Sequence, residues 1–183
     1  MKKVIVKCKL TNPQDFEQRL NDIDLYFSGT IWQHDRVYVP RGYKPHQNYP
    51  RLVMRTQMTD VKQPAKYYLL QRRHIEASGA NIINGTSVED YAAMVNIIHQ
   101  LGFTKLTEVS RRRRELRMGE GVIIFLDDVD NLPGAYAKME AILEEHESVE
   151  ELMQDLNKTF TVLGQKHIVN QTYADLIEPA DIS

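Results

Sequence analysis

The sequence is poor in the residues on which several common protein classes depend. Cys8 is the only cysteine among 183 residues, which excludes an internal disulfide and a cysteine-rich metal site. No apolar run approaches the roughly 20 residues that a membrane-spanning helix needs. No secretory leader with a small-residue cleavage site follows Met1. We therefore expect a soluble, cytoplasmic protein that has no membrane partner.

The chain also lacks a strong excess of either charge. Its 23 basic and 25 acidic residues give a net charge of −2, and this total provides no general attraction to nucleic acid. The charges are distributed unevenly, however, because residues 111–117 are mainly basic and residues 144–155 are mainly acidic. A near-neutral total can therefore conceal a basic interior beneath an acidic surface.

Apolar residues make up 42% of the chain, enough for one sizeable core, and we expect a single domain over residues 1–183. Alternating positions and helix caps predict two successive sets of elements, followed by helices at 148–163 and 170–177. The first set, residues 2–74, has a strand at 2–10, a helix from Asn12-Pro13 to Ser28-Gly29, and strands at 30–39, 51–58 and 66–74, with a loop at 40–49. After a turn at 75–80, the second set, residues 81–142, has a strand at 81–86, a helix at 87–101, and strands at 104–118, 122–129 and 135–142.

Each set has the order strand, helix, strand, strand, strand. Short links between strands favour hairpins and therefore an antiparallel sheet. A sheet of eight strongly twisted strands can remove its free edges by closing on itself. The predicted fold class is α+β, an eight-stranded antiparallel β-tunnel (barrel) built from two βαβββ halves, with flanking helices.

Charged residues alternate with other residues along several predicted strands. Arg111 and Arg113 share one face of their strand, and Lys138 and Glu140 share one face of theirs. These charges can lie on solvated outer faces, whereas a concave charged face would need a ligand. The backbone of RNA or DNA is a rival ligand for the four arginines at 111–114. Only alternate residues of that run share a face, and this disfavours nucleic acid as the ligand.

Several short motifs stand in the order found in a known family. They are Gln33-His34-Asp35 with Val37-Tyr38 (Q-x-D-x-Y-F), Arg55 (the second arginine of L-R-x-R), Arg111 with Arg113 (K-x-R), Leu126-Asp127 with Val129 (L-D-x-V), residues 134–140 (G-x-F-x-E-x-E) and residues 173–177 (S-Y-x-x-L-L). Their order and the duplicated architecture make the sequence resemble the CYTH proteins, also called triphosphate tunnel metalloenzymes. The resemblance spans most of residues 3–177 and is strongest to the class IV adenylyl cyclase-like branch.

The resemblance implies a tunnel whose basic residues hold a triphosphate and whose acidic residues hold Mg²⁺ or Mn²⁺. Arginine suits this role because its planar fork matches the geometry of phosphate. The implied phosphate-binding residues are Lys7, Lys9, Arg55, Arg111, Arg113 and Lys138. The implied metal ligands are Asp127 and Glu140, with Asp35 and Glu115 as additional acids. The family's L-T-x-K strand corresponds to residues 69–72, where we take Gln71 as the lysine position.

The sequence departs from the family at its acidic positions. Alignment of the motif E-x-E-x-K on Lys9 leaves Ile5 and Lys7 in place of two glutamates, and a later E-x-E becomes Lys138 and Glu140. A lysine brings a positive charge of its own toward phosphate. It cannot bridge phosphate oxygens or orient a leaving group as a metal does. We therefore expect phosphate binding that depends less on metal.

Two classes of function remain open at this point. The first is a domain that binds a nucleotide, triphosphate or polyphosphate with reduced or no catalysis. The second is a Mg²⁺- or Mn²⁺-dependent adenylyl cyclase or triphosphate phosphohydrolase with a rearranged metal site. In an alternative interpretation of the acids, Asp127 and Glu140 pair with the basic residues and hold no metal. A protein-interaction role for the acidic helix at 144–155 and a homodimer are also open.

Overall fold

The computed structural model describes residues 2–44, 49–60, 62–75, 80–119 and 121–178. The predicted loop at 40–49 and turn at 75–80 lie partly outside these residues. The strands are β1 (Lys2–Lys9), β2 (Ile31–Pro40), β3 (Arg51–Met58), β4 (Lys66–Ile75), β5 (Ala80–Val88), β6 (Phe103–Met118), β7 (Val122–Val129) and β8 (Ala135–Ile142). The helices are α1 (Pro13–Asn21), α2 (Tyr91–Gln100), α3 (Val149–Val162) and α4 (Tyr173–Ile177).

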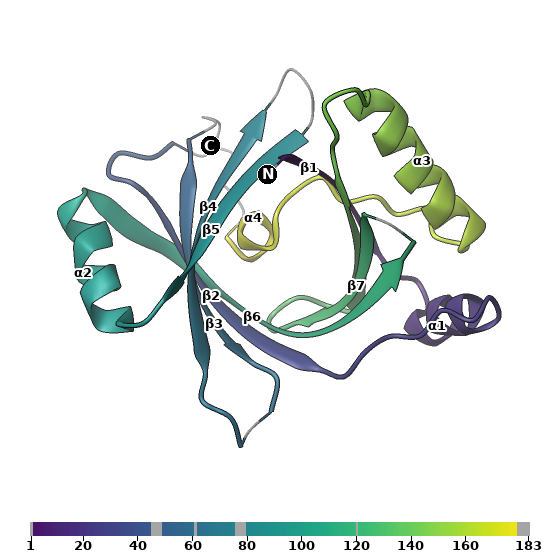
Figure 1. Cartoon of the computed structure of the whole chain (residues 1–183), viewed down its shortest axis with the longest axis horizontal. Coiled ribbons are helices and arrows are strands. Elements are labelled where there is room, and N and C mark those ends of the chain that lie inside the picture. The colour runs from purple at the N-terminus through teal and green to yellow at the C-terminus, as the bar shows by residue number, and fades with distance from the viewer. Residues whose placement is uncertain (1, 45–48, 61, 76–79, 120, 179–183) are drawn as a thin grey trace.

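The eight strands form one closed antiparallel barrel, as predicted (Figure 1). Its strand order is β1-β5-β4-β3-β2-β6-β7-β8, and β8 pairs with β1 to complete the circle. The order strand, helix, strand, strand, strand occurs twice along the chain. The halves meet where β2 pairs with β6, where β4 pairs with β5, and where β1 pairs with β5 and β8. Closure removes the free edges that an open sheet of this size would expose.

The alternation of β1 divides its side chains between the inside and the outside of the barrel. Val4, Val6 and Cys8 are buried on the outer side, in a cluster with side chains of α1 and α3. Lys7 therefore points inward, since neighbouring strand residues face opposite sides. The register pairs Lys7 with Lys138 of β8, so two lysines face each other across adjacent strands.

All four helices are shorter than predicted, and α1 and α2 differ the most from the predicted ranges. Asn12 caps α1 as expected, but the helix ends at Asn21 rather than at Ser28-Gly29. Asp24 adopts the left-handed conformation (φ 59°), and the amide of Leu25 donates to the carbonyl of Leu20. That bond is the one that terminates a helix in a Schellman motif. The chain then runs on without helix until β2 begins.

The second helix begins later than predicted. Strand β5 continues through Val88, because Val88 still pairs with Tyr67 of β4. Asp90, and not a residue at the start of the predicted range 87–101, then caps α2 and accepts a hydrogen bond from the amide of Ala93. Ladder bonds to β4 thus outweigh the local capping tendency of the earlier residues.

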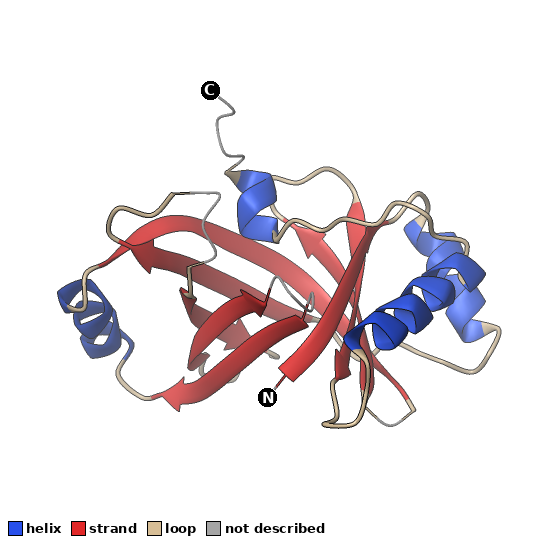
Figure 2. Cartoon of the chain, turned by 90° about the horizontal axis from the view of Figure 1, so that it is seen from above, coloured by secondary structure: helices blue, strands red, loops and turns tan. Residues whose placement is uncertain are grey.

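The helices occupy two kinds of position around the barrel (Figure 2). Helices α1 and α3 pack on outward side chains of β1, β6, β7 and β8. Helix α2 packs on outward side chains such as Tyr38 and Met54. Helix α4 instead contacts inward side chains, including Val37 and Val109. Within the described ranges, no helix is long and apolar enough to cross a membrane.

Candidate functional site

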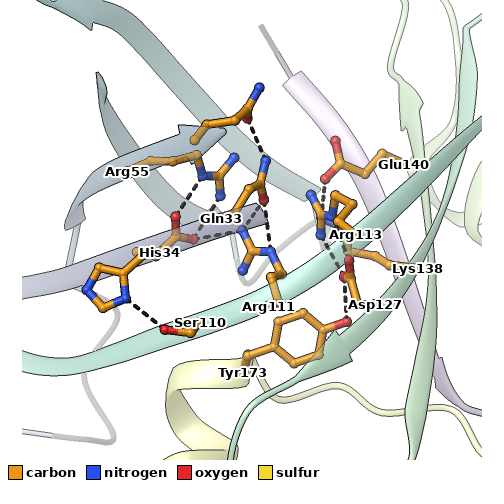
Figure 3. A network of polar contacts seen from close by, with 12 residues as sticks. Gln33, His34, Arg55, Ser110, Arg111, Arg113, Asp127, Lys138, Glu140 and Tyr173 are labelled. Atoms are coloured by element: carbon orange, nitrogen blue, oxygen red, sulfur yellow. Dashed lines mark hydrogen bonds and ion pairs between the residues drawn. The ribbon is translucent and has the colours of Figure 1, made fainter. Parts of the chain in front are cut away.

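Inward positions of seven strands, β1 to β4 and β6 to β8, gather basic and acidic side chains in the middle of the barrel, and Figure 3 labels several of these residues. The basic members are Lys7, Arg55, Arg72, Arg111, Arg113 and Lys138, and the acidic members are Asp35, Asp127 and Glu140. We call these nine residues the basic cluster. Residues two apart on a strand share a face. Arg111 and Arg113, which are separated by one residue, therefore both point into the barrel.

One part of the cluster is organised around Asp35 of β2. Arg55 donates two hydrogen bonds to its carboxylate, at 2.7 and 2.8 Å, and Arg111 donates a third at 2.8 Å. Arg111 also donates to Oε1 of Gln33, whose own amide donates to Gln57. Burial opposes ionisation of Asp35, but the charges of Arg111 and Arg55 hold its pKa well below the usual range.

A second part joins β6 to β7 and to α4. Arg113 donates two hydrogen bonds of 2.6 Å to Asp127, and the hydroxyl of Tyr173 donates to the same carboxylate at 2.8 Å. The guanidinium of Arg113 also stacks on Phe125, 4.1 Å from the ring centre. Against the effect of burial, the charge of Arg113 and its hydrogen bonds lower the pKa of Asp127 to about 2.

The third part is held by Glu140 of β8. Its carboxylate accepts hydrogen bonds from Lys138 and from Lys3, the latter at 2.8 Å. Burial, followed by the charge of Arg113, lowers the pKa of Lys138 to about 7. The charges of Lys138 and Lys3 more than offset burial at Glu140 and lower its pKa. Lys138 is thus a lysine that can lose its proton near neutral pH.

Lys7 and Lys9 of β1 have different surroundings. Lys7 is buried, its ammonium donates to the carbonyl of Gln171, and it lies 4.3 Å from the ring centre of Tyr173. Burial lowers its pKa to about 8. Lys9 is half-buried beside Gly134, and among the described residues no hydrogen bond or ion pair of its ammonium is found. Lys7 therefore lies in the cluster, whereas Lys9 lies at the end of the strand.

Arg72 is the member that sequence reasoning missed. Its Nε is buried without a hydrogen-bond acceptor, and its guanidinium makes no hydrogen bond or ion pair with the parts of the chain that the structure describes. Burial and the charge of Arg55 lower the pKa of Arg72 to about 10. Gln71, aligned earlier with the family's lysine, is exposed and bonds to Asn84. The L-T-x-K motif could have identified Arg72, because its fourth position over residues 69–72 is Arg72 and not Gln71.

The carboxylates of the cluster are already engaged with cations. Asp35, Asp127 and Glu140 each accept at least two hydrogen bonds from basic side chains. In the described ranges, no group of three or more His, Cys, Asp or Glu side chains is placed to hold a metal. Mg²⁺ and Mn²⁺ need free oxygen ligands in a tight shell. As they lie, these residues do not fit a divalent ion, and a metal role for Asp127 and Glu140 stays a prediction.

The cluster as a whole carries more positive than negative charge. Its six basic side chains face three carboxylates, so the interior has an excess of cations even though the whole chain is slightly acidic. Cations concentrated in a low-dielectric interior attract a compact polyanion more strongly than the same charges in water. The arrangement suits the recognition of several linked phosphate groups.

The run of arginines at 111–114 divides between the two sides of the wall. Arg111 and Arg113 point inward, whereas Arg112 pairs with Asp128 and Arg114 pairs with Glu17 outside the barrel. The outward pair is thus neutralised by local acids. This division does not favour a continuous basic surface for nucleic acid.

Comparison with known proteins gives one family. A family model described as the CYTH domain matches residues 1–173, and no curated protein matches the chain. A solved structure of a protein from Pyrococcus horikoshii aligns with a TM-score of 0.83 at 18% identity, over 96% of this chain and 98% of its own. A candidate adenylate cyclase from Vibrio parahaemolyticus aligns at 0.75 and 15% identity, over 96% and 97%. A candidate adenylyl cyclase from Hippeastrum, described as having a dominant triphosphatase activity, aligns at 0.64 and 13% identity, over 100% and 98%.

Proposed function

The chain belongs to the CYTH domain family, and on this premise we propose that its barrel binds a nucleotide, triphosphate or other polyphosphate with little or no catalysis. The observation that carries the proposal is Arg72, a half-buried cation without a hydrogen-bonded partner in the described chain. A buried charge is costly unless something pairs with it. Anionic phosphate supplies the missing partner.

The neighbouring cations would complete the contact. Arg72 lies close enough to Lys7 and Lys138 for its charge to lower their pKa values. The charge of Arg111 in turn lowers the pKa of Arg72. Arg55, Arg111 and Arg113 already form ion pairs with Asp35 or Asp127. A bound phosphate would therefore share these arginines with the carboxylates. We assign the first contact to Arg72 and the surrounding ones to Lys7, Arg111 and Lys138.

Reduced dependence on metal follows from the same geometry. Lysines stand at two positions where the family pattern has glutamates, and the remaining carboxylates are paired with cations. The cluster therefore needs no divalent ion to make its field attractive to phosphate. Without a polarising ion, transfer of a phosphoryl group or closure to a cyclic nucleotide loses its main electrostatic assistance.

A calorimetric titration of tripolyphosphate and ATP, run in EDTA and again in excess Mg²⁺ or Mn²⁺, tests the proposal. We expect binding in EDTA and an affinity that changes less than about tenfold when metal is added. The control is Arg112→Ala, an exposed residue outside the barrel, which should bind like the unaltered chain. Absence of binding in EDTA would refute the proposal.

The alternative is a metal-dependent cyclase or triphosphate phosphohydrolase. It is favoured by the solved neighbours, two of which are described as candidate cyclases, one with a dominant triphosphatase activity. Assays for released phosphate and for cyclic nucleotide in Mg²⁺ and Mn²⁺ decide between the two. Turnover that is lost in Asp127→Ala and Glu140→Ala, with binding of tripolyphosphate retained, would establish the enzyme.

A further inference from the structure

Closure of the barrel leaves a stretch of β5 without a partner on one side. On its β4 side, β5 is paired along its whole length, Ala80–Val88. On the other side β1 pairs with β5 over two residues, and β1 begins at Lys2, opposite Ile82 (Figure 1). Among the described residues, no strand pairs with this side of β5 over residues 83–88. We call residues 83–88 the open edge.

The open edge presents unused backbone hydrogen-bonding groups. In an antiparallel sheet, alternate residues of a strand direct their N–H and C=O groups toward one neighbouring strand, and the residues between them do so toward the other. Every second residue of the open edge therefore directs both groups away from β4. Residues 84–87 are exposed. Helix α2, which follows β5, packs on the outer wall with Tyr38 and Met54. Another strand can therefore reach this edge.

The open edge lacks the features that usually prevent strand addition. Natural edge strands are commonly protected by charged side chains, proline or a bulge. Residues 81–88 contain no charged residue and no proline. Their pairing with β4 proceeds without a shift of register, so no bulge bends this edge away. An edge of this kind is a template for an added strand.

A second copy of the chain can pair with this edge about a two-fold axis. Residues that pair across antiparallel strands point to the same side of the sheet, so a two-fold axis perpendicular to the sheet places one residue opposite itself. With Thr86 at the axis, residues 84–88 pair with the same residues of the second copy in reverse order. An axis at Gly85 would instead set Val88 opposite Ile82, where β1 already pairs. The edge therefore favours the register centred on Thr86.

This register also brings opposite charges together at both ends of the paired stretch. The added β5 and the β1 of the second copy lie end to end along the same edge, because β1 begins opposite Ile82. Glu89 follows the paired stretch directly and therefore comes next to Lys2 of the second copy. Both side chains are exposed, and neither makes an ion pair within the described parts of the chain. Two-fold symmetry forms this contact twice.

We propose that two copies of this chain associate through the open edge, as antiparallel β5 strands related by a two-fold axis at Thr86, with Glu89 of each copy against Lys2 of the other. The inference goes beyond phosphate binding and does not depend on it. Residues 84–88 are far fewer than the roughly 20–30 residues per side of a standard interface. We therefore expect a weak dimer that forms as the protein concentration rises.

Sedimentation equilibrium of the purified chain, from about 1 μM to about 1 mM, tests the association. We expect a reversible equilibrium between monomer and dimer. Thr86→Lys places two ammonium groups opposite each other at the axis and should weaken the dimer at least about fivefold. A chain that stays monomeric at every concentration overturns the inference, even if an unrelated extended peptide adds to the same edge.

Charge reversal tests the register. Lys2→Glu and Glu89→Lys should each weaken the dimer about tenfold, because each places like charges at both ends of the pairing. The chain that carries both substitutions should recover the original affinity to within about threefold. Lys166→Glu is the matched control, because it makes the same charge change at an exposed lysine in the segment that pairs near the other end of β1. A double variant as weak as either single variant overturns the inference.

Amide hydrogen exchange reports directly on the paired strand. Alternate amides within residues 84–88 should exchange more slowly in concentrated than in dilute protein, because the dimer supplies their missing acceptors. The amides of residues that already bond to β4 serve as an internal reference. A dimer in which all amides of residues 84–88 exchange equally at both concentrations uses another surface and overturns the inference. Thermal unfolding of each variant verifies that the barrel remains folded.

Discussion

Replacing Arg72 with methionine should stabilise the protein while it weakens phosphate binding. Methionine retains an unbranched side chain of similar reach and removes the charge. In the ligand-free barrel the Arg72 guanidinium has a buried Nε without an acceptor and lies near the like charges of Arg55 and Arg111. The substitution therefore removes an unfavourable charge from the free protein and a favourable one from the complex.

The magnitude follows from the pKa of Arg72, which burial and Arg55 lower from 12.5 to about 10. One pKa unit corresponds to about 1.4 kcal/mol, so the full shift would represent on the order of 3 kcal/mol. Because the side chain is only half-buried, solvent screening leaves about 1–2 kcal/mol. The folded-state pKa lies below the unfolded one, so this cost is fully present below about pH 10 and disappears as the pH rises toward 12.5.

Urea unfolding at neutral pH and tripolyphosphate calorimetry measure the two effects. We expect Arg72→Met to raise the free energy of unfolding by about 1–2 kcal/mol and to weaken binding about tenfold or more. Arg113→Met is the matched control, because it leaves the buried carboxylate of Asp127 without its arginine partner. It should destabilise by roughly 3–5 kcal/mol. If Arg72→Met destabilises like Arg113→Met, or binds tripolyphosphate normally, the reasoning about Arg72 is wrong.

Three further predictions concern the same cluster. Lys138 and Lys7, with pKa values of about 7 and 8, should take up protons when phosphate binds, because the anion favours their charged forms. The affinity for tripolyphosphate should therefore fall between pH 6 and 9, and calorimetry in buffers of different ionisation enthalpy should show the proton uptake. An affinity that does not change with pH would contradict this prediction. Glu140→Gln should strengthen the binding of tripolyphosphate in EDTA on the order of tenfold. It should also lower stability, as judged by thermal unfolding, because two lysines lose their anionic partner. Weaker binding would argue against an excess of positive charge inside the barrel. Tyr173→Phe should cost about 1–3 kcal/mol in urea unfolding, because Asp127 loses a buried hydrogen bond, and no change would mean that this bond is replaced by water.

The sequence by itself determined the order of the elements and the closure of the sheet. Alternating side chains in stretches such as residues 2–10 specify strands, and Asn12 and Ser148 specify helix starts, because these signals act over a few neighbouring residues. Eight strongly twisted antiparallel strands can then remove their free edges by closing into a barrel. The inward direction of Arg111 and Arg113 followed from the same alternation together with the family resemblance.

Only the tertiary structure decided which charges are paired. The partner of Arg113 is Asp127 on the adjacent strand, and the partners of Asp35 come from β3 and β6; register across strands is set by the whole sheet and not by local sequence. The same holds for Arg72, whose lack of a hydrogen-bonded partner in the described chain depends on where every neighbouring carboxylate lies. It also holds for α4, since a five-residue helix has too few residues to specify where it packs, and its contacts with the inward residues Val37, Val53 and Val109 supply that information.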